Sequence, residues 1–197
     1  MKRMLVAVVL GVCALLTQAI GEGGATGVNL LGNPGFDAPG GRAGEIPDRW
    51  VVFAEEKALI GIVPGRGLDG SPCVSLGSVN IPRSFQGIMQ TVGVEEGRRY
   101  TLSALVINNK EDPLQGSAYG QLVIEWKDSA GNEIGRIWGT QWKKNISRIR
   151  WELMSIARVR APESAVEANI GIHLYEGIQS NRKGGFLVDG VSFVCEE

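Results

Sequence analysis

Two tryptophans lie four residues apart in the stretch GRIWGTQWKKN, at Trp138 and Trp142, with arginine, glutamine and lysine beside them. A flat indole ring stacks on the apolar C–H face of a sugar, and nearby polar groups pair with the hydroxyls around its rim. The pair therefore predicts that at least one of the two rings contacts a ligand. The alternative is that one of them covers the edge of the fold as a hydrophobic plug.

Polar candidates come from alternate positions of stretches that read as strands. In EANIGIHLYEG, one row is apolar, while Asn169, His173 and Tyr175 fall on the opposite row. Glu125 occupies the corresponding row of GQLVIEWKD, and an ordinary solvated surface would show the same pattern. Trp126 shares the other row of that stretch with Leu122 and Ile124 and is expected in the core. The predicted ligand-binding residues are Trp138, Trp142, Tyr175, His173, Glu125, Asn169, Tyr119 and Gln86.

The same polar row allows a catalytic interpretation. His173 as base, Tyr175 as acid and a carboxylate such as Glu125 would suit a polysaccharide lyase or hydrolase. The sequence contains no GxSxG, HExxH or phosphate-binding glycine loop. The residues therefore favour a non-catalytic binding protein. A third alternative is a surface adhesion module whose aromatic segment docks a protein.

Charge and targeting signals narrow the class of partner. A net charge of −1 and a pI near 6.0 provide no broad basic field, which argues against nucleic acid and anionic membranes. Lys2 and Arg3 precede a short apolar run and small residues, the layout of a signal peptide over 1–19 with cleavage near 19–25. We expect residues 26–197 to form one exported domain, extracellular or periplasmic, without membrane contact after cleavage.

From residue 50 onward, apolar residues recur at a period of two and turn residues interrupt them regularly. No stretch keeps a helical apolar stripe over three turns. Short strands separated by glycine- and proline-rich turns are typical of antiparallel sandwiches and barrels. The sequence therefore predicts an all-β fold.

Several stretches in order carry a resemblance to a known family: NLLGNPGFDAP, PDRW, SPCVSL, QTVGVEEGRRYTLSALV, Trp151 before Ala161-Pro162, and GGFLVDGVSF. The chain resembles the jelly-roll carbohydrate-binding modules of the xylan- and β-glucan-binding group, which have a galactose-binding-like fold. The resemblance implies a two-sheet antiparallel β-sandwich whose first and last strands are neighbours. It also implies that Trp50 and Trp151 occupy structural positions of the core. It also implies binding of polysaccharide chains on a concave sheet. Such modules usually accompany a catalytic domain, so a separate catalytic protein is an expected partner.

The resemblance further implies a structural calcium ion near the chain ends, with Asp37 and Asp189 as its acidic ligands. Family members usually carry Glu at the position of Asp37 and often a second acid at the position of Gly190. The alternative is that the two acids only accept hydrogen bonds from turn backbone. Separately, an oxidising destination makes a Cys73–Cys195 disulfide reasonable, and two independent thiols are the alternative.

Overall fold

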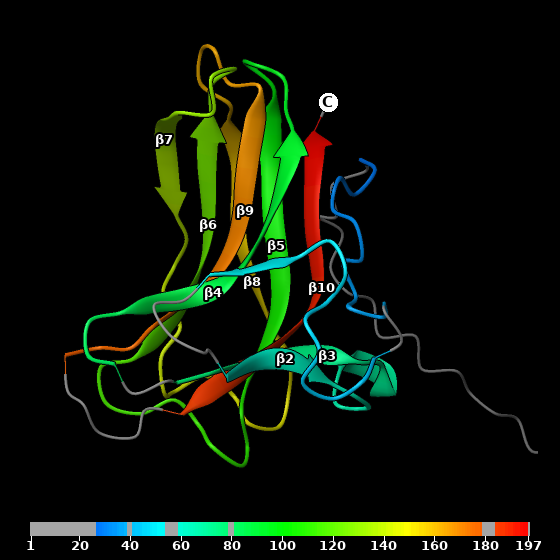
Figure 1. Ribbon diagram of the computed structural model, residues 1–197, viewed down its shortest axis with the longest axis vertical. Coiled ribbons are helices and arrows are strands. Elements are labelled where there is room, and N and C mark those ends of the chain that lie inside the picture. Colours follow the sequence, from blue (N-terminus) through cyan, green and yellow to red (C-terminus); the bar gives the residue numbers. More distant parts are fainter. Residues whose placement is uncertain (1–26, 39–40, 54–58, 79–80, 179–183, 197) are drawn as a thin grey trace, which may run out of the picture.

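Two antiparallel sheets of five strands each pack face to face in the computed structural model of the chain (Figure 1). The structure describes residues 27–38, 41–53, 59–78, 81–178 and 184–196. The predicted signal peptide, 1–19, lies outside the described residues. The architecture confirms the predicted all-β sandwich.

Each sheet is named here after its central strand. The β9 sheet has the order β1-β4-β9-β6-β7, with β1 (Val51–Phe53), β4 (Phe85–Gly93), β9 (Glu167–Tyr175), β6 (Tyr119–Lys127) and β7 (Glu133–Trp138). The β10 sheet has the order β2-β3-β10-β5-β8, with β2 (Leu59–Val63), β3 (Cys73–Gly77), β10 (Gly185–Glu196), β5 (Arg99–Asn108) and β8 (Glu152–Arg160). A short 3-10 turn, η1 (Leu68–Gly70), connects β2 to β3. Within the described residues, no helix has the length and apolar content that a bilayer span requires.

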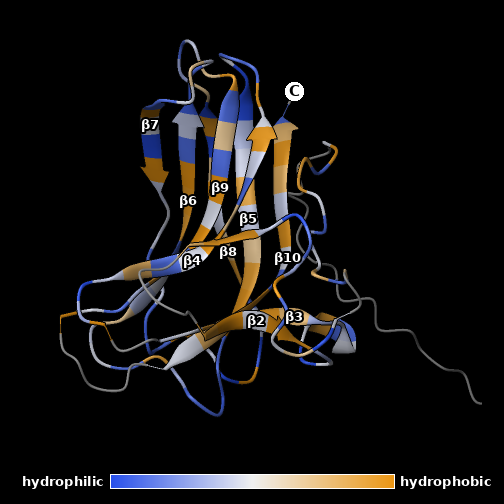
Figure 2. Ribbon diagram, viewed as in Figure 1, coloured by the Kyte–Doolittle hydropathy of each residue, from blue (hydrophilic) through white to orange (hydrophobic). Residues whose placement is uncertain are grey.

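The core lies between the two sheets and follows from the period-two pattern. One row of β9, from Ala168 to Leu174, is completely buried, and rows from β10 and β5 meet it from the other sheet. Figure 2 shows long hydrophobic stretches on the central strands and mostly hydrophilic connections at their ends. Burying one large apolar side chain contributes roughly 1.5–3 kcal/mol, so these rows fix which face of each strand turns inward. Trp50 and Trp126 belong to this core as predicted, while Trp151 is half-buried.

The beginning and the end of the described chain are neighbours, which confirms that expectation. Asn29 bridges Val194 of β10, and its side-chain amide donates to the Val191 carbonyl at 3.0 Å. The Asn29 side-chain oxygen accepts the backbone N–H of Phe193 at 3.0 Å. Figure 1 shows this first segment (blue) running beside β10 (red). Asn29 thus connects the first described segment to the last strand, β10, by hydrogen bonds.

The predicted Cys73–Cys195 disulfide is wrong, because both cysteines are free thiols. Val188 of β10 pairs with Val74 of β3, which sets Cys73 beside residue 189. The stretch from 189 to 195 spans roughly 20 Å at about 3.3 Å per residue. A disulfide needs Cα atoms within about 7 Å of each other, so strand register keeps the two thiols apart.

Candidate functional site

Six rings lie together on the outer face of the β9 sheet, the face turned away from the core. The rings of Phe85 and Tyr175 are 4.8 Å apart, and that of Tyr119 lies 4.9 Å from Tyr175. The imidazole of His173 lies 4.6 Å from the Phe53 ring and 5.9 Å from the Trp138 ring, edge to face in both cases. We call this set the aromatic layer; its members are Phe53, Phe85, Tyr119, Trp138, His173 and Tyr175.

Strand register brings these rings together from five strands. Tyr175 of β9 pairs with Phe85 on one side and with Tyr119 on the other. Residues directly opposite in antiparallel strands share a face, so the three rings must project from the same side. Alternation along β9 then places His173 on that side too, two residues before Tyr175.

Glycine leaves room for two of the rings to lie against the sheet. A Cβ at Gly171 would come within 2.6 Å of the His173 Nε2 atom. A Cβ at Gly87, which pairs with both Phe53 and His173, would come within 2.8 Å of the Phe53 ring. The middle of the face is therefore bare backbone covered by two flat rings.

Trp138 is the most exposed ring of the layer and is held in place from the side. Its side chain is 47% exposed, and the Arg136 guanidinium carbon lies 5.0 Å from its ring centroid. Arg136 donates to both carboxylate oxygens of Glu133, at 2.9 and 2.6 Å, and lies 3.1 Å from Glu125. A cation over an exposed ring contributes about 0.5–1 kcal/mol. The acids fix the guanidinium, and the guanidinium restrains the indole.

His173 places a neutral imidazole at the floor of the aromatic layer. It is 7% exposed, and its Nδ1 atom finds no hydrogen-bond partner among the described residues. Burial, followed by the nearby positive charge of Arg136, lowers the pKa of His173 to about 3. A buried polar atom without a partner costs about 1–3 kcal/mol.

The polar candidates occupy the neighbouring part of the same face and are joined to one another. Thr91 donates to the Asn169 side-chain oxygen at 2.7 Å. The Asn169 amide donates to Glu125 at 3.2 Å, and Glu125 faces Arg136. This network extends from β4 across β9 and β6 to β7. A sugar ring over the aromatic layer would meet an ordered set of donors and acceptors there.

Trp142 is not on this face, contrary to the prediction. It is 2% exposed and packs edge to face on Phe186 of the other sheet, with ring centroids 5.2 Å apart. Trp138 pairs with Val123, whereas Trp142 pairs with Gly120. Three steps along β6 thus correspond to four steps from Trp138 to Trp142. The extra residue reverses the alternation and turns the second indole into the core.

Gln86 is also absent from the outer face, contrary to the prediction. It is 1% exposed and pairs with Leu174, whose side chain belongs to the core. Its amide donates to the Gly77 carbonyl of β3 at 2.8 Å and to the buried Glu176 carboxylate at 2.6 Å. Gln86 therefore links the two sheets at one end of the sandwich. The other six predicted residues share the outer face.

Sequence reasoning missed Phe53, Phe85 and the structural part played by Arg136. The row of Phe85, Gly87 and Met89 looks as apolar as a core row, so alternation alone could not assign it to the outside. Phe53 ends a strand of three residues, too short to show a period. The opposite row of β4 contains Gln86, Ile88 and Gln90, all of them buried, so polarity along this strand gives no signal of which face turns inward.

The two predicted calcium ligands lie near each other at the chain ends, and the metal site stays a prediction. Asp189 accepts hydrogen bonds from the Leu68 N–H at 2.7 Å, the Ser71 hydroxyl at 3.2 Å and the Gly190 N–H at 2.7 Å. Burial raises the pKa of Asp189, these hydrogen bonds oppose the rise, and the charge of Asp37 adds to it. Among the described residues, no group of three or more His, Cys, Asp or Glu side chains is arranged to hold a metal ion. A cation would therefore depend on two acids plus backbone carbonyls.

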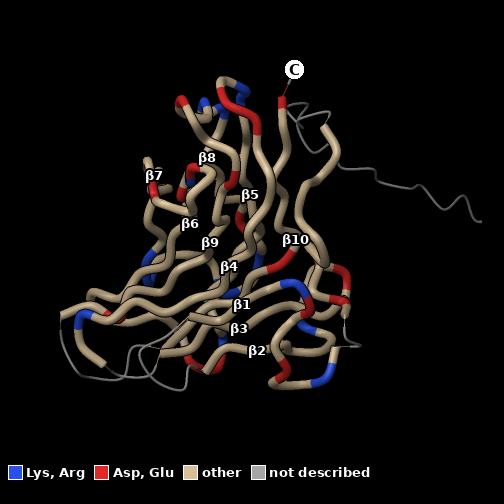
Figure 3. The backbone as a smooth tube through the Cα atoms, turned by 45° about the horizontal axis from the view of Figure 1, so that its top comes forward, with Lys and Arg blue, Asp and Glu red and all other residues tan. Residues whose placement is uncertain are grey.

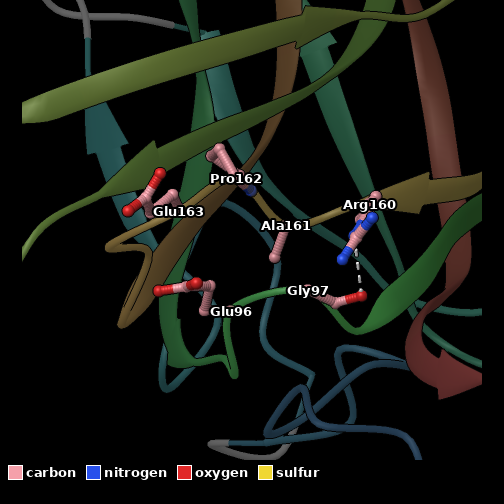
Figure 4. A pocket seen from close by; sticks show the side chains of 6 residues that line it. All are labelled: Glu96, Gly97, Arg160, Ala161, Pro162 and Glu163. Carbon is pink, nitrogen blue, oxygen red and sulfur yellow. Dashed lines mark hydrogen bonds between the residues drawn. The ribbon is translucent and has the colours of Figure 1, made fainter.

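A surface depression lies near the start of β9, at the end of that strand away from Tyr175, and it is lined mainly by charged residues and backbone (Figure 4). It lies where the connection after β4 meets the one after β8, and Arg160 donates to the Gly97 carbonyl at 3.1 Å. Glu96 accepts the Ser164 N–H at 2.8 Å, so its carboxylate joins the two connections. Figure 4 shows Glu96 and Glu163 projecting on the same side. No ring of the aromatic layer lines it.

Comparison with known proteins gives similarity in structure only. No family model matches the chain, and no curated protein matches its sequence. The CBM22-1 xylan-binding domain of Paenibacillus barcinonensis Xyn10C is 12% identical with a TM-score of 0.58, over 89% of this chain and 99% of that one. TmCBM61, solved in complex with β-1,4-galactotriose, is 18% identical with a TM-score of 0.55, over 86% and 99%.

A larger protein shares the fold as well. The enzymatically active domain of bacteriophage CBA120 tailspike protein 4 is 17% identical with a TM-score of 0.59, over 85% of this chain. This chain spans only 21% of the length of that protein. Identities this low establish the fold alone. The chain has the jelly-roll β-sandwich fold of the carbohydrate-binding modules of families 22 and 61, as the sequence resemblance implied.

Proposed function

We propose that this protein binds polysaccharide chains on the outer face of the β9 sheet, without cleaving them. The observation that carries the proposal is the aromatic layer, in which Phe85 and Trp138 remain 37% and 47% exposed. Exposed rings within such a cluster on one sheet face are costly to leave in water unless they meet an apolar partner. The C–H faces of successive sugars are such a partner, flat and rimmed by hydroxyls.

The polar groups on the same face support a sugar rather than a purely apolar ligand. The network of Thr91, Asn169 and Glu125 lies beside the aromatic layer and is held by hydrogen bonds of 2.7 and 3.2 Å. Buried or ordered polar groups next to stacking rings fix orientation and give specificity. Preorganisation of Trp138 by Arg136 would reduce the entropy lost on binding.

The arrangement gives the catalytic alternative little support. A general base works best with a pKa near the working pH, whereas burial holds the pKa of His173 at about 3. Glu125 is engaged by Arg136 and Asn169. The proposal therefore assigns these groups to binding. It includes export from the cell and action alongside a separate catalytic protein.

Affinity electrophoresis against a panel of soluble β-linked polysaccharides tests the proposal. At least one polysaccharide should retard the wild-type chain, and Trp138→Ala should weaken that retention about tenfold or more, since interface aromatics often contribute 2 kcal/mol or more. Leu153→Ala, which shortens a side chain 66% exposed on the other sheet, is the matched control. A reducing-sugar and unsaturated-product assay runs in parallel. Product formation that disappears in His173→Ala would overturn the proposal, as would the absence of any retardation.

A further inference from the structure

A strongly basic segment, residues 143–150 with the sequence KKNISRIR, follows Trp142 directly. It carries four cations and no acid, in a chain whose net charge is −1. All four cations are exposed, and none of them joins a salt bridge with another described residue. Elsewhere charges of both signs alternate around the ends of the strands (Figure 3). The cations of the basic segment are Lys143, Lys144, Arg148 and Arg150.

The basic segment begins at the edge of the aromatic layer. Trp142 and Gly120 exchange two backbone hydrogen bonds, of 2.9 and 3.0 Å. In an antiparallel bridge, the residue after Trp142 lies beside the residue before Gly120, so Lys143 runs next to Tyr119. Tyr119 is the ring that closes one end of the aromatic layer through its contact with Tyr175. The first cation of the basic segment therefore adjoins the aromatic layer.

The basic segment is also fixed in place. The Asn108 side chain donates to the Lys144 carbonyl at 3.2 Å, and the Asn108 N–H donates to the Ser147 carbonyl at 2.8 Å. Ile146 is buried, 7% exposed, and anchors the turn from below. These contacts hold the backbone while the four charged side chains point into solvent. The positive charge is thus built into a defined place rather than spread along a loose tail.

One neighbouring acid offsets only part of this positive charge. Glu152 accepts the Ser147 N–H at 2.7 Å, so its carboxylate lies at the segment, and four cations against this one acid still leave a positive surface. Ile149 is 91% exposed between two of the arginines. At physiological ionic strength charges act over about 8 Å, so the cations act on whatever passes immediately over them. A chain that leaves the aromatic layer beside Tyr119 passes there.

We propose that the polysaccharide is anionic, with uronic-acid carboxylates that pair with the basic segment while neutral sugar rings stack on the aromatic layer. This inference rests on the proposed binding function and adds the class of ligand. Lysine and arginine hold carboxylates through charge-assisted hydrogen bonds, which neutral hydroxyls form more weakly. The binding surface is then bipartite, with stacking on the β9 sheet and charge pairing on residues 143–150.

The experiment compares one polymer in two charge states. Wild-type protein is titrated with glucuronoxylan and with the same glucuronoxylan after chemical reduction of its carboxyl groups. The double variant Lys143→Gln, Lys144→Gln is expected to bind the native polymer about three- to tenfold more weakly, because exposed charge pairs each contribute modestly. Its affinity for the reduced polymer should change less than about twofold.

A charge-matched control removes two cations elsewhere. The double variant Arg98→Gln, Arg99→Gln changes two residues where β5 begins. The basic segment contacts Asn108 at the other end of that strand. The nine steps between Arg99 and Asn108 span roughly 30 Å. This control should bind both polymers as the wild type does. Raising the salt concentration should weaken binding of the native polymer and hardly affect the reduced one.

The outcomes separate this inference from the function on which it rests. Equal affinity of wild-type protein for both polymers, unchanged in the Lys143, Lys144 variant, would overturn the anionic ligand and leave carbohydrate binding standing. Retention of neither polymer, nor of any in the wider panel, would overturn both. Equally tight, Lys143-dependent retention of dextran sulfate or duplex DNA would show a general polyanion surface and overturn the uronate assignment.

Discussion

Replacing Gly120 by alanine should destabilise the fold, because the place of a Cβ atom there is filled by Trp142. A Cβ at Gly120 would come within 2.3 Å of the Trp142 indole and within 2.6 Å of the Phe186 ring. Both rings are nearly or fully buried, so neither can move into solvent. Overfilling a packed core costs about 1–3 kcal/mol. In a chain of this size, that corresponds to a fall of roughly 2–12 °C in Tm.

Thermal and urea unfolding followed by circular dichroism measure this effect. Gly93→Ala at the end of β4 is the matched control, since nothing lies within 4 Å of its added Cβ. That variant should be neutral or slightly stabilised, because alanine reduces the conformational freedom of the unfolded chain. A second change, Trp142→Leu in the Gly120→Ala background, should recover part of the loss through a favourable coupling between the two positions.

The result bears on the candidate site because the inward turn of Trp142 and the outward turn of Trp138 have one cause, the extra residue opposite β6. If the Gly120→Ala variant is as stable as the Gly93→Ala variant, the close packing of Gly120 against Trp142 is refuted. So would the absence of coupling between positions 120 and 142. Either result would place the second indole elsewhere and undo the explanation of why only one of the pair is exposed.

Three further results are expected. Burial, with the nearby Asp189 charge, raises the pKa of the Cys73 thiol to about 12. Alkylation of the native protein followed by peptide mapping should therefore find Cys195 modified and Cys73 intact. Equal labelling of the two cysteines would contradict this. Because the pKa of His173 falls from 6.5 to about 3 on folding, the unfolded chain binds the extra proton between these values. The contribution of His173 to the free energy of unfolding should therefore be greatest above pH 6.5 and decrease below it, by at most about 1.4 kcal/mol per pH unit. If His173→Gln shows the same pH profile as the wild type, His173 is not the cause of this decrease. If calcium joins Asp37 and Asp189, chelation should lower the Tm of the wild type but not of Asp37→Asn, and a wild type indifferent to chelation would remove the metal.

The fold could be predicted because alternation is a strong signal when one face of nearly every strand is buried. In β9 the apolar row fills the core and the polar row lies outside, as the sequence of that strand indicates. The same reasoning placed Asn169, His173 and Tyr175 on one face. Register then brought Tyr119 and Glu125 to that face from β6.

The errors came from features that alternation does not encode. An extra residue between Trp138 and Trp142 reverses the direction of the second side chain, and no letter in GTQ marks where it is inserted. Gln86 is polar and lies in the core because the buried Glu176, directly after the end of β9, gives it a partner. Such pairings depend on which strands become neighbours. A single sequence does not show that.

The most direct test of the central claim follows the fluorescence of one indole during ligand titration. Trp138 is 47% exposed, whereas Trp50, Trp126 and Trp142 are each at most 4% exposed and Trp151 is half-buried, so a bound sugar should change the environment of Trp138 most. A polysaccharide that retards the protein should therefore alter the emission of the wild type, and Trp138→Phe should lose most of that change. Binding that leaves the wild-type emission unchanged, or changes both proteins alike, would place the ligand away from the aromatic layer and contradict the account.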